Sequence, residues 1–251
     1  MTARVVAVVP ARWGSTRLPG KPLADIGGKP MVRHVVERAA RARAVERVIV
    51  ATDDERIAAA VRGFGGEVVM TGAGFATGTD RVAHVAAGLP EADIVVNVQG
   101  DEPLLEPAMI DEAVQPLLAD AALPVGTLAR RIVDPAELSA PGVVKVVADR
   151  RGRALYFSRA PVPFARDLAP AALVGRGAAF AHVGLYVFRR DFLLRFPLLP
   201  RTVLEEVEQL EQLRILEHGF PIAVTVTAYA SIAVDTEADL VRVRSMVEAQ
   251  G

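Results

Sequence analysis

Short apolar runs rich in β-branched residues recur along the chain, and segments with helical spacing lie between the early ones. The runs cover residues 5–9, 48–51, 68–70, 94–98 and 143–147. Runs this short and largely apolar are typical of strands buried on both faces. Helical spacing of apolar positions predicts helices over residues 31–43, 54–62 and 79–87. The alternation predicts an α/β fold with a mostly parallel central sheet flanked by helices.

The pattern changes from about Pro124 onward. Strands are predicted over residues 127–133, 155–158, 183–188 and 222–226, and helices over residues 204–218 and 236–249. The sequence shows no flexible linker and no internal repeat. We therefore expect one domain over residues 1–251, with a nucleotide-binding half, 1–123, and a more mixed half, 124–251.

Composition and charge exclude several classes of function. The 251 residues carry a formal net charge of −1, which predicts no nucleic-acid partner and no anionic membrane partner. The chain has no cysteine, which excludes a disulfide framework, a thiol nucleophile and a cysteine zinc site. No signal-peptide segment and no apolar run of membrane-spanning length are recognised. These features predict a cytoplasmic protein.

A cationic loop follows the first predicted strand. Residues 10–22, PARWGSTRLPGKP, contain Arg12, Arg17 and Lys21 together with two glycines and two hydroxyl side chains. Free backbone amides and fixed cations form a cradle for a polyphosphate. The loop is not a Walker A motif, because five residues separate its glycines and a proline follows its lysine. A solvated basic loop is the alternative interpretation.

Two acidic residues lie at positions that suit a magnesium site. Asp101 follows the apolar run at residues 94–98, and Asp235 precedes the last predicted helix. Two carboxylates near a phosphate-binding loop could share a Mg²⁺ ion. The alternatives are that Asp101 caps a turn and that Asp235 caps, or nearly caps, the helix.

Three other patterns indicate no separate chemistry. The glycine-rich segment at residues 72–78 does not have the spacing of a dinucleotide-binding fingerprint. The four histidines have no metal-ligand spacing. The leucine-rich stripe within residues 204–216 is typical of a core or a subunit interface.

Six segments in order along the chain resemble one known family. They read PARWGSTRLPGKPL, VVNVQGDEPLL, ALYFSRAPVPF, HVGLYVFR, LEQLR and VDTEADL. The sequence resembles the 3-deoxy-D-manno-octulosonate cytidylyltransferases, or CMP-Kdo synthetases, from about residue 4 to residue 246. The first segment separates it from the sialic acid cytidylyltransferases.

The resemblance implies a reaction and an assembly. The reaction is CTP + Kdo → CMP-Kdo + diphosphate with Mg²⁺, for lipopolysaccharide biosynthesis, in a homodimer. The implied fold is a Rossmann-like nucleotidyltransferase fold whose smaller mixed subdomain serves dimerisation and sugar binding.

The resemblance also implies roles for particular residues. CTP is expected to contact Ala11, Arg12, Ser15, Arg17, Lys21, Thr77, Gly78 and Gln99. Kdo is expected to contact Gln99, Arg159, His182, Glu211 and Gln212. Asp101 and Asp235 would hold magnesium, and Lys21 and Arg12 would act with them in catalysis.

The sequence departs from the family at two places. Residues 74–79, GFATGT, stand where the family often has DHxSGT, so Phe75 replaces the histidine near the base site. Residues 200–205 also differ from the usual SPLE form. A related acid sugar, such as 8-amino-Kdo or another ulosonic acid, and a catalytically silent nucleotide-binding homologue remain alternatives at this point.

Overall fold

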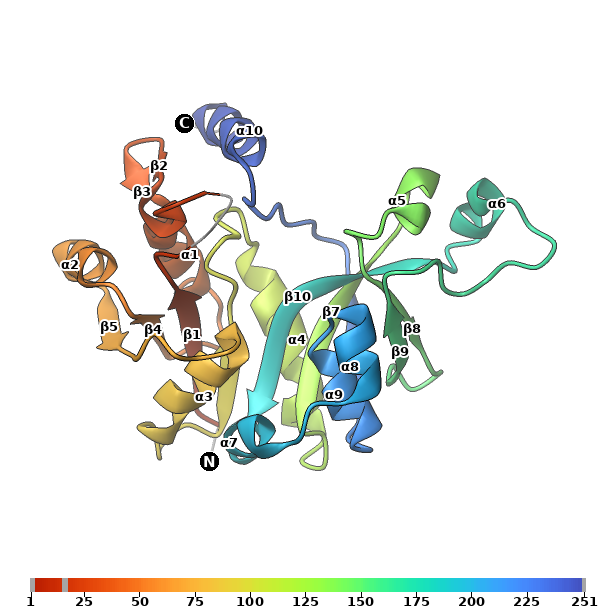
Figure 1. The fold of residues 1–251 in the computed structure, drawn as a ribbon, viewed down its shortest axis with the longest axis horizontal. Coiled ribbons are helices and arrows are strands. Elements are labelled where there is room, and N and C mark those ends of the chain that lie inside the picture. The colour runs from red at the N-terminus through yellow and green to blue at the C-terminus, as the bar shows by residue number, and fades with distance from the viewer. Residues whose placement is uncertain (1–2, 15–17, 250–251) are drawn as a thin grey trace. The chain divides into compact units, whose positions relative to one another are not determined.

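The structure is a computed structural model that describes residues 3–14 and 18–249 (Figure 1). The chain forms two compact units. One comprises Met1–Asp111 together with Ala230–Gly251, and the other comprises Glu112–Tyr229. The division differs from the predicted halves, because the last segment of the chain returns to the unit formed by the first.

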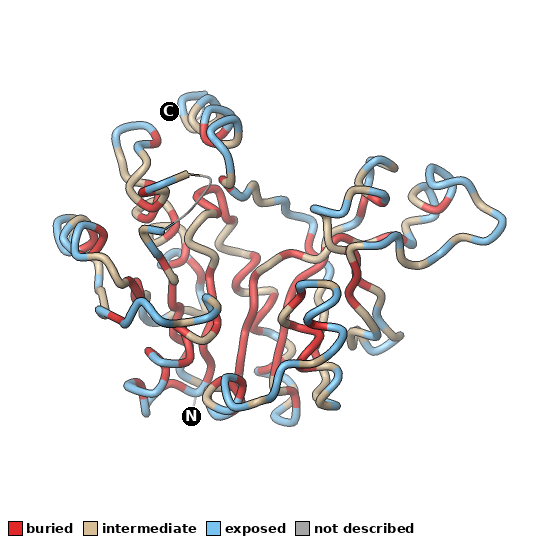
Figure 2. The backbone as a smooth tube through the Cα atoms, in the orientation of Figure 1, coloured by how far each residue is buried: buried red, intermediate tan, exposed pale blue. Residues whose placement is uncertain are grey.

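The first unit is built on a parallel sheet. Its strands are β1 (Val5–Ala11), β4 (Arg47–Thr52), β5 (Glu67–Met70) and β6 (Ile94–Asn97), in the order β6-β1-β4-β5. In the pairing of β1 with β4, Val9 lies opposite Val50. The central strands β1 and β6 are buried along nearly their whole length (Figure 2), which matches their largely apolar sequence. The predicted parallel sheet is confirmed.

The remaining elements of this unit are short. They are η1 (Lys21–Leu23), β2 (Asp25–Ile26), β3 (Lys29–Pro30), α1 (Met31–Ala39), α2 (Glu55–Gly63), α3 (Gly78–Ala87) and α10 (Glu237–Glu248). Helix α4 (Pro107–Ala119) carries the chain into the second unit. Thr77 and Thr236 begin α3 and α10 with capping boxes, so both helix starts are fixed by side-chain hydrogen bonds.

The second unit contains a mixed sheet. Strand β7 (Val125–Arg131) pairs antiparallel with β10 (Phe180–Arg189) and parallel with β11 (Ile222–Thr227). Strand β8 (Lys145–Ala148) pairs antiparallel with β9 (Ala154–Ser158) and with β10. The helices are α5 (Pro135–Ser139), α6 (Pro170–Gly175), α7 (Arg190–Arg195), η2 (Phe196–Leu198), α8 (Val203–Glu208) and α9 (Gln212–Glu217).

The prediction of one long helix over residues 204–218 is wrong. The segment forms two short helices, α8 and α9, separated at Gln209, whose φ angle is 52°. The Gln209 side chain donates to the Glu206 carbonyl oxygen at 2.6 Å. Arg214 of α9 donates through Nε to the Glu205 carboxylate of α8 at 2.8 Å. A buried ion pair thus ties the two helices together across the break.

None of the helices in the described part of the chain combines the length and apolar character that crossing a membrane requires.

Candidate active site

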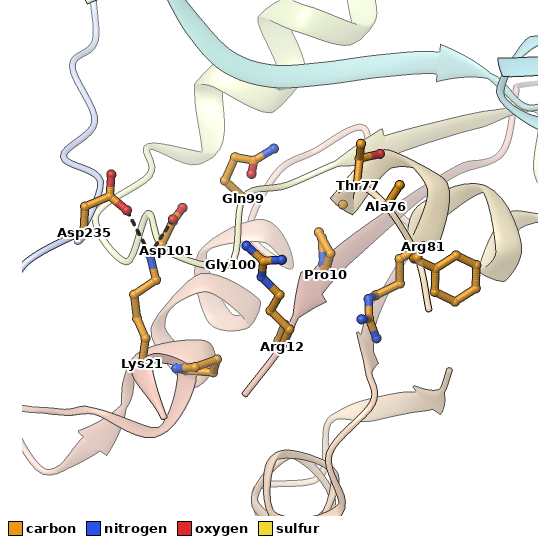
Figure 3. Close-up of a pocket in the computed structure, with 14 residues that line it drawn as sticks. Pro10, Arg12, Lys21, Ala76, Thr77, Arg81, Gln99, Gly100, Asp101 and Asp235 are labelled. Atoms are coloured by element: carbon orange, nitrogen blue, oxygen red, sulfur yellow. Dashed lines mark hydrogen bonds and ion pairs between the residues drawn. The ribbon is translucent and has the colours of Figure 1, made fainter. Parts of the chain in front are cut away.

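A cavity of about 430 Å³ lies in the first unit, where β1 and β6 end (Figure 3). Parallel strands place their carboxyl ends at one edge of a sheet, which is the usual ligand site of such folds. Five separate segments of the chain line the cavity. They contribute Pro10, Ala11 and Arg12; Lys21 and Pro22; Phe75, Ala76, Thr77, Gly78 and Arg81; Gln99, Gly100 and Asp101; and Asp235.

The Lys21 ammonium group joins the two acidic residues that the sequence singles out. Lys21 Nζ donates to Asp101 Oδ2 at 2.7 Å and to Asp235 Oδ1 at 3.2 Å. It also donates to the Val234 carbonyl oxygen at 2.8 Å. The three residues come from η1, from the loop after β6 and from the segment before α10. Asp235 lies one residue before the helix N-cap, Thr236, so its carboxylate is directed to Lys21 instead of capping the helix.

Two glycines explain how these segments approach one another. A Cβ atom at Gly100 would lie 2.6 Å from the Pro10 carbonyl oxygen, so only glycine lets the loop after β6 run this close to β1. Gly20 has a φ angle of 69°, and a Cβ atom there would lie 2.9 Å from the Trp13 ring. The Arg56 guanidinium carbon lies over the same ring, 3.3 Å from its centroid. The two ends of the cationic loop are therefore packed in place.

Arg12 and Lys21 of this loop line the cavity, as does Ala11. Ser15 and Arg17 lie outside the residues that the structure describes. Asp101, Asp235 and Gln99 line the same cavity as the cationic side chains. The structure thus brings together the described residues expected near the phosphates, the metal and the nucleotide–sugar junction.

The expected base-site segment forms one wall of the cavity. The Thr77 hydroxyl accepts a hydrogen bond from the Asp80 amide at 3.1 Å, so this side chain starts helix α3. Gly78 follows it and packs beside Pro10. Phe75 also lines the cavity, and its ring centroid lies 5.2 Å from that of His84. A phenyl ring without hydrogen-bonding atoms therefore stands at the position where a histidine is expected from the family resemblance.

Sequence reasoning missed Arg81 at this wall. Its side chain is 5% exposed and donates to the Asp53 carboxylate at 2.8 Å and to the Thr71 hydroxyl. The guanidinium carbon lies 5.6 Å from the Phe75 ring centroid. A buried charged group is stable only when it is paired. The partner of Arg81, Asp53, lies 28 residues earlier, and no local pattern links the two positions.

Apart from Gln99, which lines the cavity of the first unit, the residues expected to face the sugar lie in the second unit. His182 Nε2 lies 2.9 Å from the Thr127 hydroxyl oxygen, and its ring contacts Phe157 and Tyr186 at centroid distances of 5.0 and 5.3 Å. Burial lowers the pKa of His182 to about 3. Burial also raises the pKa of Tyr186, and the nearby charge of Glu211 adds to that effect. Gln212 is buried at the start of α9.

Arg159 is held by backbone carbonyls. Its guanidinium donates to the carbonyl oxygens of Glu208 at 2.8 Å, Pro141 at 3.0 Å and Gln209 at 3.3 Å. Three of its five N–H donors are thus engaged, which leaves at most two for a ligand. Its backbone amide donates to Glu208 Oε2 at 2.9 Å.

Glu208 and Lys145 also contact Arg159, and the sequence did not single out either residue. The Glu208 carboxylate accepts from Ser158 Oγ at 2.6 Å as well as from Arg159. Burial acts to raise the pKa of Glu208, but the hydrogen bonds from Ser158, the Arg159 amide and Tyr156 outweigh it and hold the pKa below its ordinary value. The Lys145 ammonium binds the Arg159 carbonyl oxygen at 2.6 Å.

The donor set around Lys21 suits a hard divalent cation. Among residues 3–14 and 18–249, no three His, Cys, Asp or Glu side chains gather into a metal-binding group. Mg²⁺ characteristically binds one or two carboxylates and completes its shell with substrate phosphates and water. Asp101 and Asp235 both accept from the Lys21 ammonium nitrogen, so their carboxylates lie close enough to bind one cation.

A parallel α/β sheet, a cationic loop after its first strand and two carboxylates that converge beside that loop are features of a nucleotidyltransferase. Comparison with known proteins agrees, because a family described as "Cytidylyltransferase" matches residues 6–226. Relatives named 3-deoxy-manno-octulosonate cytidylyltransferase include one from Geobacter metallireducens, 59% identical over 96% of both chains. Another, from Geobacter sulfurreducens, is 58% identical over 95% of this chain and 97% of its own.

Solved structures give the same result. CMP:2-keto-3-deoxy-manno-octonic acid synthetase complexed with CTP matches with a TM-score of 0.93 and 44% identity, over 99% of this chain and 100% of the other. A 4-diphosphocytidyl-2C-methyl-D-erythritol synthase from Anaerococcus prevotii, 14% identical with a TM-score of 0.67 over 98% and 96% of the two chains, shares the fold. The chain belongs to the 3-deoxy-manno-octulosonate cytidylyltransferase family. The resemblance and fold class inferred from the sequence are therefore confirmed.

Proposed function

We propose that this protein activates Kdo by transferring the cytidylyl group of CTP to it. The observation that carries the proposal is the convergence of Lys21, Asp101 and Asp235 in the cavity of a chain that belongs to this family. The 2-hydroxyl oxygen of Kdo attacks the α-phosphorus and forms a new O–P bond. The bond from the α-phosphorus to the bridging oxygen breaks, diphosphate leaves with the electron pair, and the hydroxyl proton passes to solvent.

The chain's own contribution is to bind and orient the triphosphate. Reactions of this class depend on positioning and on stabilising charge, and require little covalent chemistry from the protein. Arg12 and Lys21 supply positive charge where negative charge accumulates on the departing diphosphate. Ser15 and Arg17 belong to the same loop and are proposed to assist them. Thr77 and Gly78 are proposed to face the base.

Asp101 and Asp235 are proposed to hold Mg²⁺, because their carboxylates converge and oxygen is its preferred ligand. When bound, the ion would neutralise charge at the α-phosphate and lower the pKa of the attacking hydroxyl. Lys21 balances the two carboxylates in the structure described here.

The acid sugar is proposed to be recognised by Arg159, His182, Glu211 and Gln212, with Gln99 at the junction with the nucleotide. A guanidinium fork matches a carboxylate, so Arg159 is proposed to bind the Kdo acid with its remaining donors. His182 is neutral at working pH because its pKa is about 3. It is therefore proposed to hydrogen-bond a sugar hydroxyl and not to act as the base.

A homodimer and a place in lipopolysaccharide biosynthesis in the cytoplasm, where CTP is available, complete the proposal. Exposed apolar side chains on α8, Val203 and Val207, support an association surface in the second unit. Light scattering is expected to give twice the 26.7 kDa mass of the chain.

Diphosphate release by the purified protein with CTP, Mg²⁺ and Kdo tests the reaction. We expect release to require Kdo, and Asp101→Asn to lower kcat by at least about a hundredfold, because metal-held charge is a large catalytic term. Asp167→Asn is the matched control, since that side chain is 86% exposed and lies in the other unit. Near-normal turnover of Asp101→Asn at saturating Mg²⁺ would contradict the metal assignment, and Kdo-independent release would contradict the reaction.

A further inference from the structure

Lysine is rare in this chain, and one of its lysines is completely buried. Only three of the 29 basic residues are lysine. Lys21 lies in the active site, and Lys29 forms a surface ion pair with Glu37 at 2.8 Å. Lys145 is 0% exposed at the start of β8, among the largest fully buried side chains of the protein. The reaction described above does not use it directly.

The Lys145 ammonium group gathers three backbone oxygens. Nζ donates to the carbonyl oxygens of Ala140 at 3.0 Å, Val143 at 2.6 Å and Arg159 at 2.6 Å. An ammonium group has three rotatable donors around a compact charge, so these acceptors use its full capacity. A planar guanidinium has its donors in a fixed fork and does not reproduce this convergence, which explains a lysine in a chain that otherwise prefers arginine.

These contacts fix the backbone of Arg159 on both sides. Lys145 holds its carbonyl oxygen, and Glu208 Oε2 holds its amide at 2.9 Å. The loop that Lys145 binds at Ala140 also carries Pro141, whose carbonyl accepts from the Arg159 guanidinium. Removing the ammonium therefore releases both the Arg159 backbone and a loop that orients its side chain.

Stability alone does not account for a charged group here. Burial of an ammonium group is unfavourable unless it is fully hydrogen-bonded, and apolar replacements of buried charges are often neutral or stabilising. Burial lowers the pKa of Lys145, the nearby positive charge of Arg159 lowers it further, and the charge of Glu208 opposes both. The arrangement is best explained by the geometry that it imposes on its neighbours.

We propose that Lys145 is a positioning residue for recognition of the acid sugar, because its ammonium group fixes Arg159 and the loop at residues 140–143 in the arrangement that presents the guanidinium to a sugar carboxylate. This inference rests on the proposed function and extends it to a residue outside the ligand contacts. It distinguishes Lys145 from Lys21, which lies at the nucleotide cavity in the other unit.

The test compares steady-state kinetics of the full-length wild type and Lys145→Met. We expect the KM for Kdo to rise at least tenfold and the KM for CTP to stay within twofold, because the nucleotide cavity is lined by residues of the first unit. Arg159→Ala should shift the KM for Kdo in the same direction. Lys29→Met is the matched control and should leave both constants unchanged. Lys145→Arg keeps the positive charge but not the geometry, so its KM for Kdo should also be raised.

Rescue separates geometry from general stability. The chain has no cysteine, so Lys145→Cys can be alkylated selectively with 2-bromoethylamine in denaturant and refolded beside an identically treated wild type. Aminoethylation returns an ammonium group to this position and should bring the KM for Kdo back to within threefold of the treated wild type. If Lys145→Met does not fold, Glu208→Gln, which weakens the hold on the Arg159 amide, should give the same selective rise.

Several outcomes would overturn the proposal. They are an unchanged KM for Kdo in Lys145→Met, equal changes in both KM values, and no recovery on aminoethylation. If Lys145→Met does not fold, an unchanged KM for Kdo in Glu208→Gln would also overturn it. A wild type that releases no diphosphate with Kdo would overturn the proposed function and this inference together. An active wild type with an unaffected Lys145→Met would overturn this inference alone.

Discussion

Two lysines show how one side chain serves two different purposes in this protein. Lys21 Nζ binds two carboxylates and one carbonyl oxygen, whereas Lys145 Nζ binds three carbonyl oxygens. The first arrangement has a net negative charge, because one ammonium group faces two carboxylates. A divalent cation can therefore take the place of the ammonium group between them. The second is a closed set of neutral dipoles around one cation. The identity of the acceptors, and not the lysine, separates a site for chemistry from a site for positioning.

His182 gives a prediction about stability and pH. Burial lowers its pKa from an ordinary value of 6.5 to about 3. Between these values the unfolded chain binds a proton at His182 and the folded chain does not, so stability is lost as the pH falls. Between pH 7 and pH 5 this loss should be about 2 kcal/mol, because the unfolded pKa lies about 1.5 units above pH 5.

Urea denaturation at pH 7 and pH 5 measures this effect. His182→Gln keeps a polar side chain beside Thr127 but binds no proton, so its free energy of unfolding should fall less than that of the wild type. His218→Gln, near the surface of the same unit, should keep the wild-type difference. Equal losses in the wild type and His182→Gln would show that this histidine is not buried in its neutral form.

At the scale of elements, the break between α8 and α9 determines where Arg159 is held. Gln209 adopts the left-handed conformation, with φ 52°, and its carbonyl accepts from Arg159. A continuous helix would direct the carbonyls of residues 208 and 209 along its own axis and use them in its own hydrogen bonds. The break therefore leaves the carbonyl oxygens of Glu208 and Gln209 free to accept from Arg159, which follows the end of β9.

Substitution of Gln209 tests the cost of this conformation. A β-branched side chain is particularly unfavourable in the left-handed region, so Gln209→Val should lower the free energy of unfolding by about 1–2 kcal/mol. Gln115→Val on the exposed face of α4 is the matched control, expected to cost less than about 0.5 kcal/mol through helix propensity. Both values come from urea denaturation. Equal effects at the two positions would contradict a specific backbone requirement at Gln209.

The same elements show how far the sequence predicts the structure. The buried strands and most helices follow from apolar periodicity, because burial on two faces or one face leaves a direct pattern. The break at Gln209 left no such pattern: the segment has no glycine or proline, and its leucines suit a continuous helix. The two carboxylates could be singled out, because Asp101 follows a predicted strand and Asp235 precedes a predicted helix. Arg81, Glu208 and Lys145 were not, because their partners are backbone carbonyls or residues distant in sequence.

At the scale of the whole molecule, the last segment of the chain completes the first unit, which contains the cavity. Residues 230–251 return to the unit formed by residues 1–111. Val234 donates its amide to the Asp101 carbonyl and accepts from Lys21, so one residue connects both parts of the site. Leu240 and Val243 of helix α10 pack in an apolar cluster with Ile26, Met31, Leu104 and Val234. Packing of this helix therefore holds Asp235 at the cavity.

Leu240 provides the decisive comparison, because it is 2% exposed while its neighbour Val241 is 53% exposed. Leu240→Ala should lower the free energy of unfolding by about 2–4 kcal/mol, as removal of a buried leucine leaves a cavity. Val241→Ala should change it by less than about 0.5 kcal/mol. Since the loosened helix begins just after Asp235, Leu240→Ala should also lower kcat/KM for CTP by at least about fivefold at a temperature where the variant remains folded. A destabilised Leu240→Ala that keeps wild-type kinetics would mean that local contacts such as the one with Lys21 hold Asp235 without the packing of Leu240, and that this packing stabilises the unit without positioning the site.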